Sequence, residues 1–323
     1  MTTRRALLAA PFVLPAMAGT ARAQDAWPSR TIAVLLGYPP GGVTDFASRA
    51  VCERLGRGLG QTVVLENRPG AATAVANTAV AQARPDGYTL LMGTSTLAIN
   101  PALQPTLTPR DPMAELTPIG TVFRTAFVLH VHPSVPARSA AELIAYARAN
   151  PGKMNFGSSG TGAVNHLCLE LFRARAGIDV VHVPYRGGAA ALLDLRAGRI
   201  QGMFNAVQEA LPAVREGATR ALAISSKQRA TAMPDLPPLA DTLADFDGVF
   251  WQGLFGPAGL PAPIVARAGA ALREATSDPS LVARMAEQGV ALTTGDDAAL
   301  RRTLVEETQM WGRLIREQNI RPE

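Results

Sequence analysis

The stretch that decides the fold is an apolar run, then a turn rich in proline and glycine, then the start of a helix: Thr31-Ile32-Ala33-Val34-Leu35-Leu36-Gly37-Tyr38-Pro39-Pro40-Gly41-Gly42-Val43-Thr44-Asp45. The run at 31–36 is short and apolar, which is typical of a strand covered on both faces. After the turn, Phe46, Ala50, Val51 and Leu55 recur at helical spacing. A strand followed by a tight turn and a helix is the building unit of α/β folds.

The same turn points to a binding role. The glycines at 41 and 42 let the backbone approach a ligand closely, and a helix N-terminus offers free N–H groups and a positive dipole end to an anion. We therefore predict a carboxylate or phosphate pocket that includes Gly41, Gly42, Val43, Thr44 and Asp45. An ordinary strand-to-helix turn capped by Thr44 or Asp45 explains these residues equally well.

The first 23 residues resemble a secretory signal peptide. Arg4 and Arg5 precede an apolar run at 6–17, and 21–23 form an Ala-Arg-Ala cleavage site. The arginine pair indicates the twin-arginine export route. The run is too short for a membrane anchor, so we expect an exported, periplasmic mature protein without residues 1–23.

Composition excludes one class of partner. Removing residues 1–23 takes away Arg4, Arg5 and Arg22 and no acid, so the formal net charge falls from +5 to +2. No stripe of Lys and Arg stands out and aromatic residues make up only 5% of the chain, which argues against nucleic-acid binding. The remaining length suits two lobes or one large α/β domain.

The two cysteines, Cys52 and Cys168, each lie in a helical pattern beside an apolar residue. We interpret them as two separate buried thiols, with a disulfide as the alternative in an oxidising compartment.

Short strand patterns alternate with helical ones along the chain. A capping box at Ser139 and Glu142 opens a helix at 140–149, Gly198 ends another helix, and Asp278 caps a third. This alternation predicts α/β layers built on parallel sheets. The predicted strands are 31–36, 62–66, 88–92, 154–157, 179–183, 200–204 and 220–225.

Three further loops share the composition of the first, and each follows a predicted strand. They lie at 93–96, 157–162 and 184–188. In open α/β sheets, ligands bind beyond the carboxyl ends of the strands, where such loops gather. Small hydroxyl side chains and free N–H groups there predict a cleft for an anion. The residues expected to contribute are Thr94, Ser95, Thr96, Ser158, Ser159, Gly160, Thr161 and Tyr185.

An ordered set of motifs resembles a known family. The set comprises 34–45, Leu65-Glu66-Asn67-Arg68-Pro69-Gly70, 84–93, Asn100-Pro101, 132–136, 156–160, 181–187 and 255–259. It is similar to the Bug, or TctC-type, family of periplasmic solute-binding proteins of tripartite tricarboxylate transporters. The resemblance covers nearly all of the mature chain.

The resemblance implies a two-lobed Venus-flytrap fold, each lobe having a mixed, mostly parallel sheet flanked by helices. Lobe one would comprise 24–123 plus 247–323, and lobe two 124–246. It also implies a small organic acid as ligand and the membrane permease subunits of a tripartite transporter as partner. We expect no cofactor and no metal: His130 and His132 would lie on one face of a strand, but no nearby Cys, Asp or third His completes a zinc site. We expect a monomer.

The resemblance further implies roles for particular loops. The loop at 41–45 would hold a ligand carboxylate by its backbone amides. The loops at 94–96 and 158–161 would add hydroxyl and amide contacts, and Asn205 would face the ligand from lobe two. Separately, Tyr38, Val43, Tyr185 and Trp251 are candidate cleft walls, with core packing as the alternative for Trp251.

Two positions depart from the family pattern. Val43 stands where the family usually has a third glycine, and Asn205 stands where an Asp is common. A carboxylate only accepts hydrogen bonds, whereas an amide also donates. We therefore expect Asn205 to reduce preference for amino-acid ligands and to tolerate a further acidic or polar acceptor. Alternatively, Asn205 merely ends a strand and caps the next helix.

Two other functions compete with solute binding for transport. One is a periplasmic serine hydrolase using Ser158 or Ser159, although Thr161 stands where a nucleophile elbow needs its second glycine. The other is a sensory binding protein that signals to a membrane receptor. We interpret the chain as a binding protein and not as an enzyme.

Overall fold

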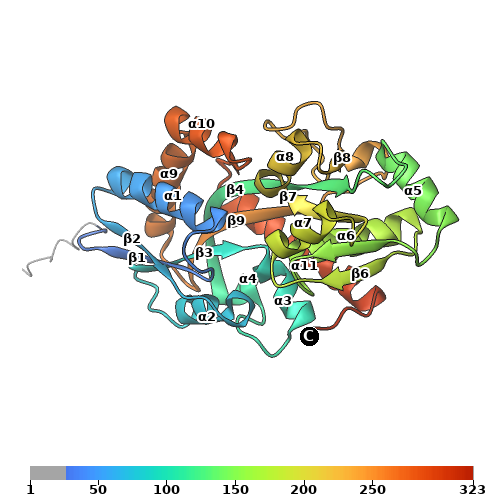
Figure 1. The fold of residues 1–323 in the computed structure, drawn as a ribbon. Coiled ribbons are helices and arrows are strands. Elements are labelled where there is room, and N and C mark those ends of the chain that lie inside the picture. The colour runs from blue at the N-terminus through green and yellow to red at the C-terminus, as the bar shows by residue number, and fades with distance from the viewer. Residues whose placement is uncertain (1–26, 323) are drawn as a thin grey trace, which may run out of the picture.

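The computed structural model describes residues 27–322. The signal peptide predicted at 1–23 lies outside the described residues. The molecule has two lobes joined by long elements that run through both (Figure 1). We call the first lobe the part that holds β1–β3 with α1, α2, α9 and α10, and the second lobe the part that holds β5–β8 with α5–α8.

The strands form one continuous sheet in the order β2-β1-β3-β9-β4-β7-β5-β6, with β10 and β8 paired to β4. Pairings of β1 with β2 and β3, and of β5 with β6 and β7, are parallel. Every antiparallel pairing involves β4 or β9. The strands are β1 Ile32–Leu36, β2 Val63–Asn67, β3 Thr89–Thr94, β4 Leu116–Val131, β5 Asn155–Ser158, β6 Val181–Pro184, β7 Gly202–Ala206, β8 Arg220–Ile224, β9 Val249–Pro257 and β10 Ala291–Leu292.

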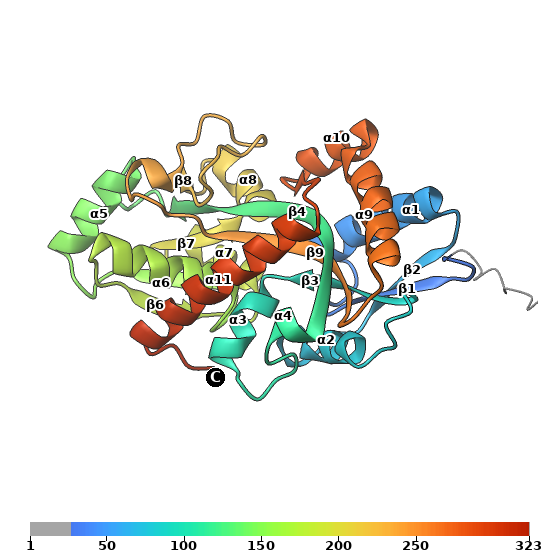
Figure 2. The same ribbon diagram turned by 180° about the vertical axis from the view of Figure 1, so that it is seen from behind.

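Helices cover both faces of this sheet (Figures 1 and 2). They are α1 Val43–Leu59, α2 Ala74–Ala81, α3 Thr96–Leu103, α4 Pro112–Glu115, α5 Ala140–Ala149, α6 Val164–Ala176, α7 Gly188–Arg196, α8 Val207–Arg215, α9 Ala262–Ser277, α10 Pro279–Glu287 and α11 Asp297–Glu317. Two short 3-10 turns lie at Ala71–Thr73 and Leu239–Asp241. Within residues 27–322, no helix is long and apolar enough to cross a membrane.

The seven predicted strands are present within about two residues of their predicted bounds. The helix predicted at 140–149 is α5, where the Ser139 hydroxyl accepts a hydrogen bond from the Glu142 backbone N–H at 3.1 Å. Asp278 caps α10 by accepting from the Leu281 N–H at 2.8 Å. Cys52 and Cys168 are both buried and free, as expected of separate thiols.

Two long strands were not predicted, and they join the lobes. The first part of β4 pairs with β9, and its last residues, from Phe127 on, pair with β7 and β8. On the rear face, α11 crosses the junction and packs on α3, β4 and α6 (Figure 2). The lobe boundaries at 123/124 and 246/247 remain a prediction; they fall inside β4 and just before β9.

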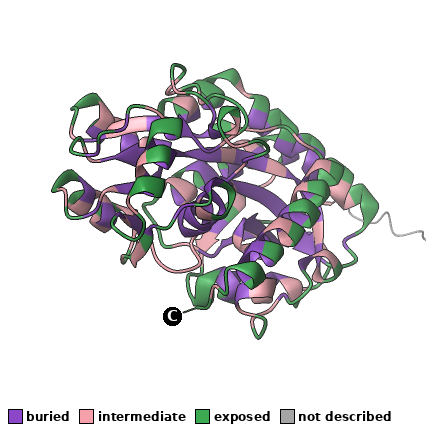
Figure 3. Cartoon of the chain, turned by 90° about the vertical axis from the view of Figure 1, so that its right-hand side faces the viewer, coloured by how far each residue is buried: buried purple, intermediate pink, exposed green. Residues whose placement is uncertain are grey.

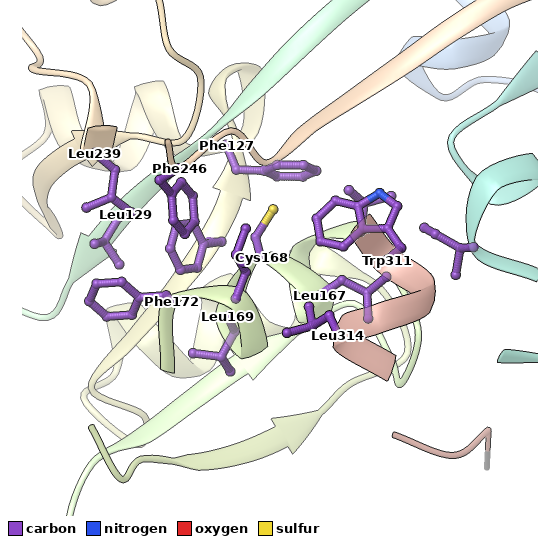
Figure 4. Packing of buried hydrophobic residues seen from close by; sticks show 14 of the residues in the cluster. Phe127, Leu129, Leu167, Cys168, Leu169, Phe172, Leu239, Phe246, Trp311 and Leu314 are labelled. Atoms are coloured by element: carbon purple, nitrogen blue, oxygen red, sulfur yellow. The ribbon is translucent and has the colours of Figure 1, made fainter. Parts of the chain in front are cut away.

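The core is a sandwich of sheet and helices (Figure 3). In the second lobe, Leu167 and Cys168 of α6 pack beside Trp311 and Leu314 of α11 (Figure 4). In the first lobe, Ala47, Val51 and Leu55 of α1 face the buried strand β1, whereas Phe46 of the same pattern is 42% exposed. These contacts fix the ends of the strands and helices that form the site.

Candidate ligand-binding site

A cavity of about 370 Å³ opens between the two lobes. The volume suits a small organic ligand. Its first-lobe side consists of the loop before α1 and the start of α3, its second-lobe side of the loops before α6, α7 and α8, and its floor of β4 and β9. The lining residues are Tyr38, Val43, Thr44, Thr96, Phe123, Thr125, Phe127, Ser159, Gly162, Ala163, Val164, Asn165, Gly188, Asn205, Ala206, Gln208, Glu209 and Phe250.

Five helices begin at this cavity, namely α1, α3, α6, α7 and α8, each with a residue of its first turn in the lining. In the described chain, none of their N-cap side chains accepts a hydrogen bond from the first turn of its own helix. Of the helices that start away from the cavity, α4, α5, α10 and α11 are capped by a side chain, whereas α2 and α9 are not. Uncapped first turns present free N–H groups and positive dipole ends, so the cavity favours an anion.

The loop before α1 is held by Asp45, which the cavity lining does not include. Its carboxylate accepts hydrogen bonds from Gly41 N at 3.0 Å, Arg49 Nε at 3.0 Å and Asn67 Nδ2 at 2.8 Å. Burial alone would raise the pKa of Asp45, but the hydrogen bonds from Arg49, Asn67 and Gly41 outweigh it and lower the pKa. Asp45 therefore braces the glycine turn, where Gly41 has a φ of +93°.

The floor and one wall are aromatic. Phe250 lies edge-on to Tyr38, with ring centroids 6.2 Å apart, and 6.0 Å from Phe123. Burial raises the pKa of Tyr38, and a hydrogen bond with Thr94 opposes that shift. These rings exclude water from one side of a bound ligand, which strengthens hydrogen bonds made on the other side.

Two asparagines shape the second-lobe wall. Asn165 Oδ1 accepts from the Ser159 hydroxyl at 2.8 Å, and Asn165 Nδ2 donates to Phe204 O at 3.2 Å. Asn205 is 1% exposed, and its Oδ1 accepts from Ala206 N at 3.0 Å. Asn205 Nδ2 is buried and has no hydrogen-bond partner within residues 27–322. Asn205 therefore does not cap α8 and keeps a donor available at the cavity.

The predicted site residues separate into two groups. The cavity is lined by Tyr38, Val43, Thr44, Thr96, Ser159 and Asn205. Outside the lining are Gly41, Gly42, Asp45, Thr94, Ser95, Ser158, Gly160, Thr161 and Tyr185. Several of the outer residues have structural partners: Ser95 Oγ accepts from Trp251 N at 3.0 Å, and Tyr185 Oη donates to Asp194 at 2.9 Å.

Ser158 has a serine–histidine contact, since its Oγ lies 2.7 Å from His182 Nε2. His182 stacks on His166 at 3.9 Å, and His166 Nε2 lies 3.5 Å from Glu170. Ser158 itself is fully buried, and its hydroxyl also contacts both backbone polar atoms of Gly160 at 3.2 Å. The contact therefore orders the loop and gives a substrate no access to the hydroxyl.

Sequence reasoning missed the aromatic floor and the start of α8. Phe123, Phe127 and Phe250 lie on the two unpredicted strands, and Glu209 follows Asn205 by four residues in the first turn of α8. Trp251, a candidate wall, is 2% exposed and donates to Glu307 Oε2 at 2.6 Å. It belongs to the core.

Another cavity, of about 400 Å³, is lined by Arg124, Lys227 and Asp247 among others. Arg124 already pairs with Asp247 at 3.3 Å and Lys227 with Asp245 at 3.7 Å, whereas Arg229 of the same lining has no ion pair among the described residues and donates to Pro234 O at 3.1 Å. Its lining includes no first turn of a described helix. The cavity at the five helix starts is the better candidate for an anion.

A two-lobed α/β chain with a ligand-sized cavity between its lobes has the architecture of a periplasmic binding protein. Residues 47–320 match the model of the tripartite tricarboxylate transporter family receptor, TctC, and the chain belongs to this family. It is 32% identical over 316 residues to protein BugT of Bordetella pertussis, covering 96% of this chain and 97% of that protein.

Solved structures agree in fold. Rpa4515 of R. palustris with adipate matches with a TM-score of 0.78 and 28% identity, covering 92% of this chain and 100% of that chain. MatC from Rhodopseudomonas palustris with bound malate matches with a TM-score of 0.74 and 30% identity, covering 90% of this chain and 100% of that chain. The predicted family and fold class are thereby confirmed.

Proposed function

We propose that this protein is a periplasmic solute receptor that captures a small carboxylate between its lobes and delivers it to the membrane permease of a tripartite transporter. One observation carries the proposal: five uncapped helix N-termini open on a cavity that no Lys or Arg of the described chain lines. Neutral N–H donors stabilise a carboxylate there and leave no buried cation when the ligand departs.

Related structures support the ligand class, since Rpa4515 holds adipate and MatC holds malate. In our proposal the carboxylate lies against the first turns of α1, α3 and α6, with the aromatic rings of β4 and β9 beneath its carbon chain. The lobes then close by bending at β4 and β9, and the closed form is what the permease recognises. The protein acts as an exported monomer without enzymatic activity, and the sealed Ser158 hydroxyl agrees with that role.

A thermal-shift screen of the mature, ligand-stripped protein tests the proposal. Carboxylic acids, including adipate, malate and amino acids, are compared with neutral amides of the same skeletons. Ligand at 100 times its dissociation constant adds about 2.7 kcal/mol to the free energy of unfolding, which raises Tm by about 4 °C. We expect acids of one group to raise Tm and their amides to have no effect. Equal shifts with acids and amides, or no shift with any acid, would contradict the proposal.

A further inference from the structure

Glu209 is the one charged side chain that lines the cavity among the described residues. It lies in the first turn of α8, and its side chain is exposed to the cavity. It forms no ion pair and no hydrogen bond within residues 27–322. A carboxylate without a partner in an anion-binding cavity needs an explanation, because it repels the group that the helix starts attract.

Helix capping does not account for the presence of the Glu209 carboxylate in the cavity. Glu209 occupies the third helical position, from which a glutamate can reach back to the N-cap backbone N–H. That N–H belongs to Ala206, and it already donates to Asn205 Oδ1 at 3.0 Å. Glu209 therefore has no hydrogen-bonded partner at the helix start and gains only the attraction of an acid for the N-termini of α8 and of the neighbouring α7.

The surroundings of Glu209 are rich in acceptors. A Cβ added to Gly188 would lie 2.6 Å from Glu209 Oε2 and 3.2 Å from Asn205 Oδ1, so both oxygens converge over the start of α7. Gln208, which also lines the cavity, has a buried amide oxygen without a donor in the described chain. Burial raises the pKa of the Glu209 carboxyl, as expected where no cation compensates its charge. A ligand group that lies directly beside the Glu209 carboxylate gains most if it donates hydrogen bonds.

We propose, as an extension of the carboxylate-binding function above, that Glu209 binds a protonated amine of the ligand and so selects amino-substituted monocarboxylates over dicarboxylates. The ligand carboxylate then lies at the starts of α1, α3 and α6, and the ammonium group lies beside Glu209, whose full negative charge has to outweigh the positive ends of α7 and α8. The ion pair neutralises the only charged side chain of the lining, whereas a second carboxylate meets like charge. This assignment reverses the expectation that Asn205 reduces preference for amino-acid ligands. The carboxylate that Asn205 lacks is provided by the side chain of Glu209, four residues later.

Titration calorimetry with matched ligands tests the assignment. The six-carbon set is 6-aminohexanoate, 2-aminohexanoate, their hydroxy counterparts, hexanoate and adipate; the four-carbon set is built in the same way and ends with succinate. Wild type, Glu209→Gln and the control Glu306→Gln are compared, because Glu306 is exposed on α11 away from the cavity. A charge-assisted hydrogen bond predicts that one amino acid binds wild type about tenfold or more tighter than the matched dicarboxylate and hydroxy acid.

In Glu209→Gln, we expect the amino acid to lose about tenfold in affinity and the dicarboxylate to gain, with no change in Glu306→Gln. Dicarboxylate or hydroxy-acid binding to wild type as tight as amino-acid binding would overturn the assignment of Glu209 while leaving the carboxylate function intact. Unchanged affinities in Glu209→Gln would do the same. If no acid of any kind binds wild type, the proposed function itself fails, and this inference fails with it.

Discussion

The substitution Glu307→Gln should remove a pH dependence from the stability of the protein. Glu307 lies on α11 at the junction of the lobes, and its Oε2 accepts from Trp251 Nε1 at 2.6 Å and from Trp311 Nε1 at 3.1 Å. Burial raises the pKa of this carboxyl to about 7, against the opposing effects of the two indole hydrogen bonds and the charge of Arg124. The folded protein therefore holds a proton that the unfolded chain releases at its ordinary value of 4.5.

The direction and the magnitude of the pH dependence that Glu307 gives to the free energy of unfolding follow from proton linkage. Between the two pKa values the folded state binds more protons than the unfolded state, so the free energy of unfolding falls as the pH rises through this window. The stabilisation is complete below the unfolded pKa and is lost once the pH passes the folded one. A shift from 4.5 to about 7 corresponds to about 3 kcal/mol across the window. Gln is neutral throughout and keeps an oxygen for the two indoles, so its variant should lack this loss.

The assay is urea unfolding followed by tryptophan fluorescence from pH 5 to pH 8, for wild type, Glu307→Gln and Glu306→Gln. Relative to wild type, Glu307→Gln should gain about 3 kcal/mol of stability on going from pH 5 to pH 8. The exposed neighbour Glu306 serves as the control, and its variant should follow wild type. Parallel pH profiles for wild type and Glu307→Gln would refute the reasoning, because they would mean that the buried carboxyl does not change its protonation on folding.

Three other substitutions address the loop, the cavity and the core. Asp45→Asn weakens the brace on the glycine turn, so the free energy of unfolding in urea should fall by about 1–3 kcal/mol and acid affinity should fall with it; unchanged affinity would separate the brace from binding. Asn205→Asp removes the unpartnered amide donor and adds a negative charge near Glu209, so calorimetry should show weaker binding of a dicarboxylate such as adipate, and equal or tighter binding would contradict that role. Leu167→Ala should cost about 2–5 kcal/mol in urea unfolding, because Leu167 is fully buried beside Trp311 (Figure 4), whereas Leu193→Ala, at a site 67% exposed, should change little. Similar losses at both leucines would contradict the packing account.

The outer strands and the helices next to them could be predicted because their signals are local. The strand at 31–36 is a continuous apolar run, and α5 and α10 have N-caps that the sequence displays. Such elements need no knowledge of their neighbours to be recognised.

The two strands that join the lobes have no such signal. In β4, Pro118 and Gly120 interrupt the apolar pattern, and two register shifts against β9 break any simple alternation. In β9, Gly253 is required by packing, since a Cβ there would lie 2.6 Å from both Leu300 methyl carbons. When only the sequence is known, such a glycine is interpreted as the sign of a turn and not of a strand.

The candidate site could be predicted in part, because some of its loops also have local signals in the sequence. The loops before α1 and α6 are recognisable by their glycine and hydroxyl residues. Val43 and Thr44, at the start of α1, and Ser159, in the loop before α6, line the cavity. Glu209 has the appearance of an ordinary acid in the first turn of a surface helix. Only the tertiary structure shows that it faces the cavity without a partner.

The central claim is that backbone N–H groups at helix starts hold the ligand carboxylate, and Val43→Pro tests it directly. Val43 is the first residue of α1, where proline fits, and Gly42 before it is extended with φ −81° and ψ 169°. The substitution removes one N–H at the cavity with little strain. Val43→Ala is the matched control, because it shortens the side chain and keeps the N–H.

The measurement is the calorimetric affinity of both variants for the acid that binds wild type best in the screen. We predict that Val43→Pro binds it about tenfold or more weakly than Val43→Ala, as expected for a lost hydrogen bond to a charged group. Equal affinity of the two variants would contradict the claim, since the carboxylate would then be held by something other than the free amide at the start of α1.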